Sequence, residues 1–135
     1  AKDMFFHGNN KTDADIQYAI DHGIGFFIVD NAEELDAIAA YAAESGIVQK
    51  ILLRVTPGID PHTFAAVNTG KVDSQFGVSI ETGQARAFVG KILQKEHISL
   101  CGFHCHIGSQ IFDQVPFFDG NLEFGRWFWR ALCGK

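Results

Sequence analysis

The sequence has few cysteines and no long apolar or basic runs, and each of these absences excludes a class of protein. Its three cysteines include no CxxC pair, so neither a disulfide framework nor a zinc ribbon is indicated and reduced thiols are expected. Lysine and arginine occur singly and the formal net charge is −5, which leaves no basic stripe for nucleic acid or an anionic membrane surface. No apolar run approaches the ~20 residues that span a bilayer.

Residues 1–4 also lack the charged and apolar regions of a signal peptide. Together these absences predict a cytoplasmic protein with no membrane or nucleic-acid partner. What the sequence does contain is 47% hydrophobic and 20% charged residues, as in an ordinary globular domain. A chain of 135 residues is nevertheless small for an enzyme with a cofactor, and we interpret it as one domain or part of one.

Short apolar runs alternate with segments of helical periodicity. Helical spacing begins after Thr12 or Asp13, begins again after Asn31, and returns over residues 83–96, and these polar residues are the expected helix caps. Strand and helix thus alternate four times, which predicts a parallel sheet covered by helices. The apolar runs themselves span residues 4–6, 26–29, 51–55 and 98–106.

A parallel α/β sheet can be an open doubly wound sheet or a closed barrel. An open nucleotide-binding fold is expected to carry a GxGxxG turn or a GxxxxGK[ST] loop, and the sequence has neither. The (β/α)8 TIM barrel is therefore favoured. Because a complete barrel needs roughly 250 residues, about four βα units amount to half of one, and we expect an internal piece of a larger enzyme.

Polar side chains gather at the carboxyl end of each predicted strand, which in a barrel is the face that displays catalytic groups. His104 and His106 are two residues apart on a strand, so they share a face. Gly108 and Ser109 would let backbone amides and a hydroxyl approach an anion. An imidazole beside a phosphate site suggests a phosphorylated cofactor. The other polar residues at these ends are Asn9, Asn10, Lys11, Asp30 and Arg54.

The string CGFHCHIGSQIFD over residues 101–113 closely resembles the GxHCHIGSQ signature of diaminopimelate decarboxylases, which are barrel enzymes dependent on pyridoxal phosphate. The resemblance covers residues 3–115 and implies the third to sixth barrel strands, a small amino-acid substrate, conversion of meso-diaminopimelate to L-lysine, and a homodimer. Ornithine and arginine decarboxylases share a looser HxGS pattern and stay as an alternative. Four further segments follow the family's order, FHGNNK (6–11), VDNAEEL (29–35), LRVTPG (53–58) and DSQFG (73–77).

The same resemblance implies cofactor contacts for four residues. His106 would stack on the pyridine ring of pyridoxal phosphate, Ser109 with Gly108 would contact its phosphate, and Arg54 would lie near the ring at the barrel mouth. In this family a lysine on the first strand binds the cofactor covalently. None of four lysines lies in a context that resembles that strand, namely Lys2, Lys11, Lys50 and Lys71. We therefore assign no catalytic residue and no metal ligand and expect the chain to be inactive alone.

Two departures from the family pattern stand out. Gln75 occupies a position where the family usually has lysine, which puts in question the charge pairing made there. The resemblance ends near residue 115, and the following segment is dense in Phe and Trp without a clean amphipathic pattern. We therefore predict a partial cofactor-binding barrel domain over residues 1–115 and an atypical aromatic tail over 116–135, produced by truncation or a frame change.

Two other functions remain open. An HxH pair at a strand end also suits a metal-dependent barrel hydrolase, although His7, His62 and His97 are poorly placed to complete such a site. The other is a non-catalytic relative that uses the barrel only to bind a partner, and it would lack the cofactor lysine.

Simpler roles remain open for the other polar residues at the strand ends. The Asn9, Asn10 and Lys11 segment could be a solvated turn, and it is kept off the list of site residues. The pair Asp30 and Asn31 is preferred as a helix cap. Arg54 could serve a structural ion pair.

Overall fold

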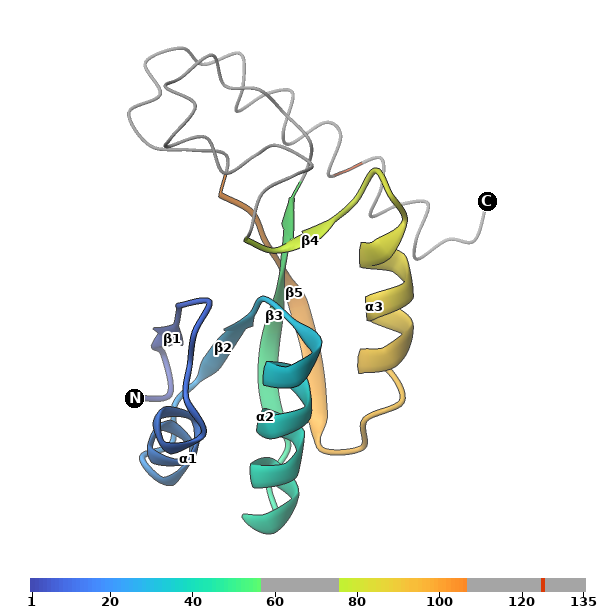
Figure 1. The fold of residues 1–135 in the computed structure, drawn as a ribbon. Helices are drawn as coiled ribbons and strands as arrows, with labels where there is room; N and C mark the ends of the chain where they lie inside the picture. Colours follow the sequence, from blue (N-terminus) through green and yellow to red (C-terminus); the bar gives the residue numbers. More distant parts are fainter. Residues whose placement is uncertain (57–75, 107–124, 126–135) are drawn as a thin grey trace, which may run out of the picture.

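The computed structural model of the chain describes residues 1–56, 76–106 and 125. Strands and helices alternate as the periodicity predicts, with one added short strand, β4 (Figure 1). The strands are β1 (Phe5–Phe6), β2 (Phe26–Val29), β3 (Gln49–Thr56), β4 (Val78–Ser79) and β5 (Ile98–His104), and the helices are α1 (Asp13–Asp21), α2 (Ala32–Glu44) and α3 (Gln84–Ile92).

The first two helices begin at residues that the sequence marks as caps. The Thr12 side chain accepts a hydrogen bond from the amide of Asp15, whose carboxylate accepts one in return from the Thr12 amide, and this reciprocal pair is a capping box. At the start of α2, Oδ1 of Asn31 accepts from the amide of Glu34 at 2.8 Å. Both predicted N-caps are confirmed. They satisfy amide groups that have no partner inside the helix.

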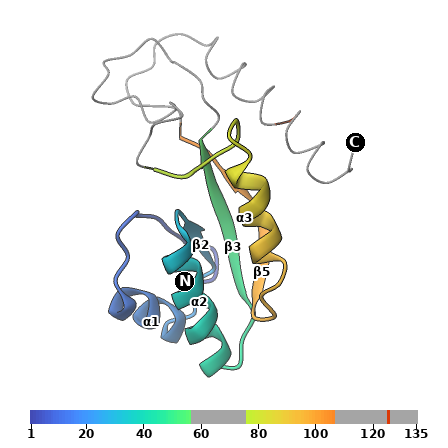
Figure 2. The same ribbon diagram turned by 45° about the vertical axis from the view of Figure 1, so that its right-hand side comes forward.

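The five strands form one sheet in which every pair is parallel. β1 pairs with β2, β2 with β3, and β3 with β5, while β4 pairs only with the end of β3, at Val55 and Thr56. The helices α1, α2 and α3 lie on one face of this sheet (Figures 1 and 2). The prediction of an α/β fold with a parallel sheet is confirmed.

The core lies between the sheet and its helices. Alternate residues of β3 point into it, and Ile51, Leu53 and Val55 are all buried. Residues of helical spacing on α2 and α3 cover them, including Leu35, Ile38 and Ile92. The other face of β3 carries Lys50, Leu52, Arg54 and Thr56, so the strand presents its one arginine away from the core.

A β-bulge in β5 decides which of its side chains join that second face. Ile51 pairs with Leu100 but Leu52 pairs with Gly102, so Cys101 is the extra residue. Because one added residue reverses the alternation of all that follow, Phe103 pairs with Leu53 and packs on the core, whereas His104 pairs with Arg54.

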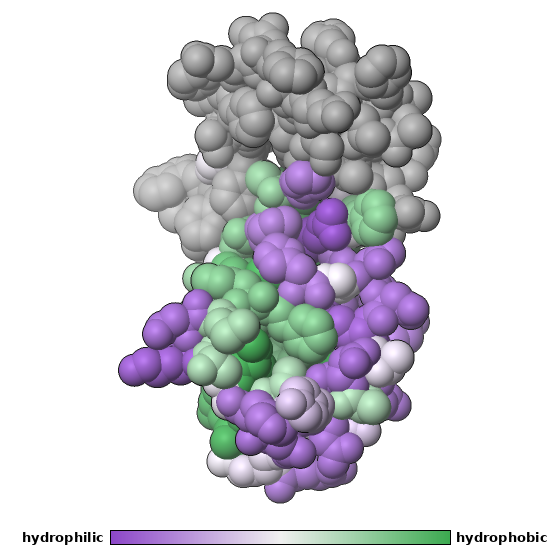
Figure 3. All heavy atoms as spheres, turned by 90° about the vertical axis from the view of Figure 1, so that its left-hand side faces the viewer, coloured by the Kyte–Doolittle hydropathy of each residue, from purple (hydrophilic) through white to green (hydrophobic). Residues whose placement is uncertain are grey.

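The second face of the sheet is the more open one. Figure 3 shows apolar side chains gathered on the face that lies on the left of Figure 1, and Met4 and Phe5 are 61% and 50% exposed. Phe5 stacks on Phe26 with ring centroids 4.7 Å apart. Among the described helices, none has the length and hydrophobicity of a membrane span.

Candidate functional site

Four polar side chains meet at the carboxyl edge of the sheet, and we call them the edge cluster: His7, Asp30, Arg54 and His104. His7 follows β1, Asp30 follows β2, Arg54 lies near the end of β3 and His104 ends β5. Parallel pairing brings the carboxyl ends of these strands to one edge, so residues separated by up to 97 positions in the sequence become neighbours.

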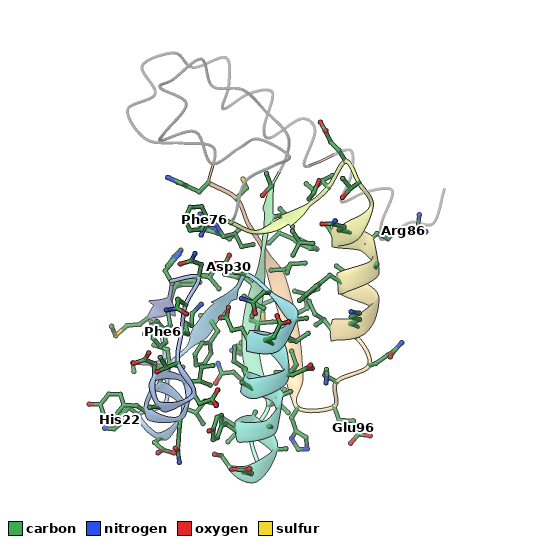
Figure 4. The ribbon with its side chains drawn as sticks, viewed as in Figure 1. Phe6, His22, Asp30, Phe76, Arg86 and Glu96 are labelled. Carbon is green, nitrogen blue, oxygen red and sulfur yellow. The ribbon has the colours of Figure 1, made fainter. Side chains whose placement is uncertain are left out.

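Arg54 is held between a carboxylate and an aromatic ring. Its Nη1 lies 3.5 Å from Oδ2 of Asp30, and the side chains are only 14% and 4% exposed. Its Cζ lies 4.8 Å from the centroid of the Phe76 ring, a cation–π contact. Figure 4 shows Asp30 and Phe76 at the same end of the strands. The ion pair that the sequence left open for Arg54 is present.

The residues around β4 position Phe76. The Thr56 hydroxyl donates to the Phe76 carbonyl at 2.6 Å, and the Ile80 amide donates to the Thr56 carbonyl at 3.1 Å. Gly77 has a φ of 76°, and a Cβ there would lie 3.1 Å from both the Arg54 carbonyl oxygen and the Thr56 hydroxyl. Only glycine combines this backbone conformation with so close an approach.

The two histidines of the edge cluster contact each other through their rings. The ring centroids of His7 and His104 lie 4.9 Å apart with an interplanar angle of 76°, an edge-to-face arrangement. Burial, followed by the charges of His7, Arg54 and His106, lowers the pKa of His104 to about 4. Burial, followed by the charges of Arg54 and Lys11, also lowers the pKa of His7. His104 is therefore neutral at pH 7.

Two buried polar atoms of the edge cluster lack a hydrogen-bond partner within the described residues, Oδ1 of Asp30 and Nδ1 of His104. Burial raises the pKa of Asp30, and the nearby charges of Arg54 and Lys11 oppose that rise. Unsatisfied buried polar groups are rare in folded proteins and indicate a bound group or a water. The cluster thus offers one acceptor and one imidazole nitrogen to a ligand.

Lys11 and Glu34 form a second polar group beside the cluster. Nζ of Lys11 lies 2.5 Å from Oε1 of Glu34, and the two side chains are 1% and 4% exposed. The interpretation of residues 9–11 as a solvated turn is therefore wrong for Lys11, although Asn9 and Asn10 are exposed. Sequence reasoning missed the pair because the two residues are 23 positions apart.

Two of the four predicted cofactor residues lie in the described part of the chain. Arg54 belongs to the edge cluster. His106 follows β5 and is exposed, and its charge is one of those that lower the pKa values of both His7 and His104. Gly108 and Ser109 lie outside the described residues, as do Gln75, His62 and the predicted tail apart from Gly125.

Asp30 differs from its predicted role. Asn31 alone caps α2, and the Asp30 carboxylate instead faces Arg54. No three His, Cys, Asp or Glu side chains within residues 1–56 and 76–106 lie close enough to share a metal ion. The cluster brings together one cation, one carboxylate and two imidazoles, which suits a ligand with anionic and hydrogen-bonding groups.

Comparisons with known sequences show which family the chain resembles. The model of the pyridoxal binding domain of pyridoxal-dependent decarboxylases matches residues 1–128. The diaminopimelate decarboxylases of Staphylococcus aureus and Bacillus subtilis are 43% and 44% identical over 124 and 117 residues, which are 92% and 87% of this chain. The chain spans only 29% and 27% of the length of these two relatives.

Solved structures give the same result. A diaminopimelate decarboxylase from Helicobacter pylori, complexed with L-lysine, aligns with a TM-score of 0.87 at 26% identity over 96% of this chain and 32% of its own. The enzyme from M. jannaschii, also with L-lysine, aligns with a TM-score of 0.76 at 36% identity over 87% of this chain and 27% of its own. An alanine racemase from Clostridium difficile shares the fold alone, at 13% identity and a TM-score of 0.68. The prediction of a partial barrel is confirmed.

Proposed function

The chain belongs to the family of pyridoxal-dependent decarboxylases, as part of their pyridoxal-binding domain, and from this membership we propose that it forms one side of a cofactor site. In the whole protein this site would serve the decarboxylation of meso-diaminopimelate to L-lysine. The observation that supports the proposal is the edge cluster, which gathers Arg54, His104 and His7 at the carboxyl ends of parallel strands.

The residues present fit pyridoxal phosphate. Its anionic groups would favour the Arg54 guanidinium, and its polar ring substituents would satisfy the unpartnered Oδ1 of Asp30 or Nδ1 of His104. His106 would stack on the ring, and Gly108 with Ser109 would contact the phosphate. When bound, pyridoxal phosphate supplies an electron sink for the bond pair that is left when carbon dioxide departs.

The side chains of this chain bind and orient rather than react. Asp30 and Phe76 hold the Arg54 guanidinium in place before any ligand arrives, which reduces the entropy lost on binding. His104 keeps a neutral imidazole at pH 7, since its pKa is about 4, and so offers a hydrogen bond without adding charge. The family resemblance implies a lysine on the first barrel strand as the covalent attachment point, and we propose no residue of this chain for that role.

The substrate and the wider setting follow from the same proposal. The H. pylori and M. jannaschii enzymes bind L-lysine, and a diaminopimelate decarboxylase would release this amino acid as its product. We propose a cytoplasmic homodimer for the whole protein. We keep the division into a barrel part over residues 1–115 and a tail over 116–135. The ornithine or arginine substrates of related decarboxylases are separate outcomes of the test.

The test is an absorbance titration of the full-length protein with pyridoxal phosphate, followed by measurement of carbon dioxide release from meso-diaminopimelate, ornithine and arginine. A new visible band with release from meso-diaminopimelate alone is the expected result. A band with release from another amino acid would reassign the substrate. A soluble full-length protein that gave no band would refute the proposal. Arg54→Gln should weaken binding of the cofactor about tenfold or more, because hydrogen bonds to charged groups contribute about 1.5–3 kcal/mol.

A further inference from the structure

One buried ammonium group ties together the ends of two strands and the start of a helix. Nζ of Lys11 donates to the Gly8 carbonyl at 2.5 Å, to the Ile28 carbonyl at 2.7 Å and to Oε1 of Glu34 at 2.5 Å. It also lies 5.7 Å from the centroid of the Phe6 ring, which Figure 4 labels on β1. All three donors of the ammonium are used, which fixes the turn after β1 against β2 and α2.

Glu34 extends this connection toward Arg54. Its second oxygen, Oε2, accepts a hydrogen bond from the Asp30 amide at 3.2 Å. Lys11 and Glu34 therefore hold the carbonyl before Val29 and the amide after it, on both sides of the last residue of β2. The Asp30 side chain that emerges there faces Arg54. A chain of contacts thus runs from Lys11 through Glu34 and Asp30 to Arg54.

Stability alone does not explain such a pair. Two charges that are removed from water lose most of the hydration that favours them, and a buried ion pair is often no more stabilising than apolar residues of similar size. What the ion pair provides and an apolar pair does not is directed hydrogen bonding to the backbone on either side of Val29.

We propose that Lys11 and Glu34 are positioning residues for Arg54: they fix the backbone around Val29, and the Asp30 carboxylate set by it orients the guanidinium toward the cofactor. This inference rests on the proposed function, which assigns Arg54 to the cofactor side of the barrel mouth. It adds a role for residues that touch no ligand.

The test compares variants of the full-length protein. Lys11→Met alone should unfold at a clearly lower temperature, because it leaves the Glu34 carboxylate buried without a cation. The double variant Lys11→Met with Glu34→Met should recover most of the lost unfolding temperature. It should nevertheless bind pyridoxal phosphate about tenfold or more weakly than the wild type. Lys95→Met is the matched control, because Lys95 pairs at the surface with Asp36 of α2, the helix that also carries Glu34. It should change neither the unfolding temperature nor the affinity for pyridoxal phosphate.

A second comparison separates positioning from packing. If the pair acts through Arg54, the triple variant with Arg54→Gln should bind pyridoxal phosphate as tightly as the single variant Arg54→Gln. The reason is that the effects of substitutions within one network do not add. Glu34→Gln serves if the double variant does not fold. It keeps the shape but leaves one oxygen for two donors, and binding should weaken in the same direction.

Three results would overturn the inference. They are wild-type affinity in the stable double variant, wild-type affinity in Glu34→Gln, and losses that add fully to that of Arg54→Gln. If the wild-type protein binds no pyridoxal phosphate, the proposed function fails. The positioning of Arg54 by Lys11 and Glu34 is then tested by titrating His104 in ¹³C-histidine NMR. Arg54 lowers the pKa of His104, so an unchanged midpoint in the double variant would overturn the inference, while a rise that matches Arg54→Gln would support it.

Discussion

Gly77 offers a sharp test of how the site is built. Its φ is 76°, and a Cβ would lie 3.1 Å from the Arg54 carbonyl oxygen and 3.1 Å from the Thr56 hydroxyl. A non-glycine residue in the left-handed region costs roughly 1–2 kcal/mol, and overpacking typically adds about 1–3 kcal/mol. Gly77→Ala should therefore lower the free energy of unfolding by about 2–5 kcal/mol.

Gly46 is the matched control. It has a φ of 65° and no atom within 4 Å of a built Cβ, so Gly46→Ala should incur only the conformational cost of roughly 1–2 kcal/mol. The difference between the two variants isolates the close approach of β4 to β3. Urea denaturation of the full-length protein, followed by fluorescence, measures both.

The close approach also matters for binding. A Cβ at position 77 would push the segment with Phe76 away from β3 and so release one side of the Arg54 guanidinium. We expect Gly77→Ala to weaken binding of pyridoxal phosphate and Gly46→Ala to leave it unchanged. Equal losses of stability in the two variants, with equal affinity for pyridoxal phosphate, would refute the reasoning.

Three further predictions concern single residues. The pKa of His104 is about 4 against an ordinary 6.5, so the unfolded chain takes up this proton first and stability falls as the pH drops from 6.5 towards 4. His104→Gln should flatten that fall by about 2 kcal/mol after allowance for partial exposure, as followed by urea denaturation across this range. Asn31→Ala should cost about 1 kcal/mol through loss of the α2 cap, and Asn31→Asp should restore it in the same assay. Thr56→Val should cost about 1–2 kcal/mol in urea denaturation because the Phe76 carbonyl loses its donor, and no loss would show that water replaces the hydroxyl.

Local patterns predicted the elements and their caps well. Thr12 and Asn31 were expected to start helices and do so, because capping depends only on residues three positions away. The short strand β4 was not predicted. Two residues carry no periodicity, and Val78 and Ser79 become a strand only through pairing with the end of β3.

The site was predicted in part. The position of Arg54 at a strand end follows from the order of apolar runs, so its place at the carboxyl edge was foreseen. Its partner was not. The sequence favoured Asp30 as a cap, and the structure turns its carboxylate toward Arg54, 24 positions away. Lys11 and Glu34 were missed for the same reason, since nothing in either segment marks the other as its partner.

The sequence by itself determined the alternation of strands and helices, the parallel sheet, the edge where polar residues gather and the family resemblance carried by residues 101–113. These depend on periodicity, on local hydrogen bonds and on residue strings. Only the tertiary structure decided which polar groups meet. The bulge at Cys101 places His104 on the same face as Arg54, and the packing of α2 on the sheet brings the Glu34 carboxylate to the Lys11 ammonium. Both arise from pairing between segments distant in the chain, where the energy of a contact depends on its surroundings more than on residue type.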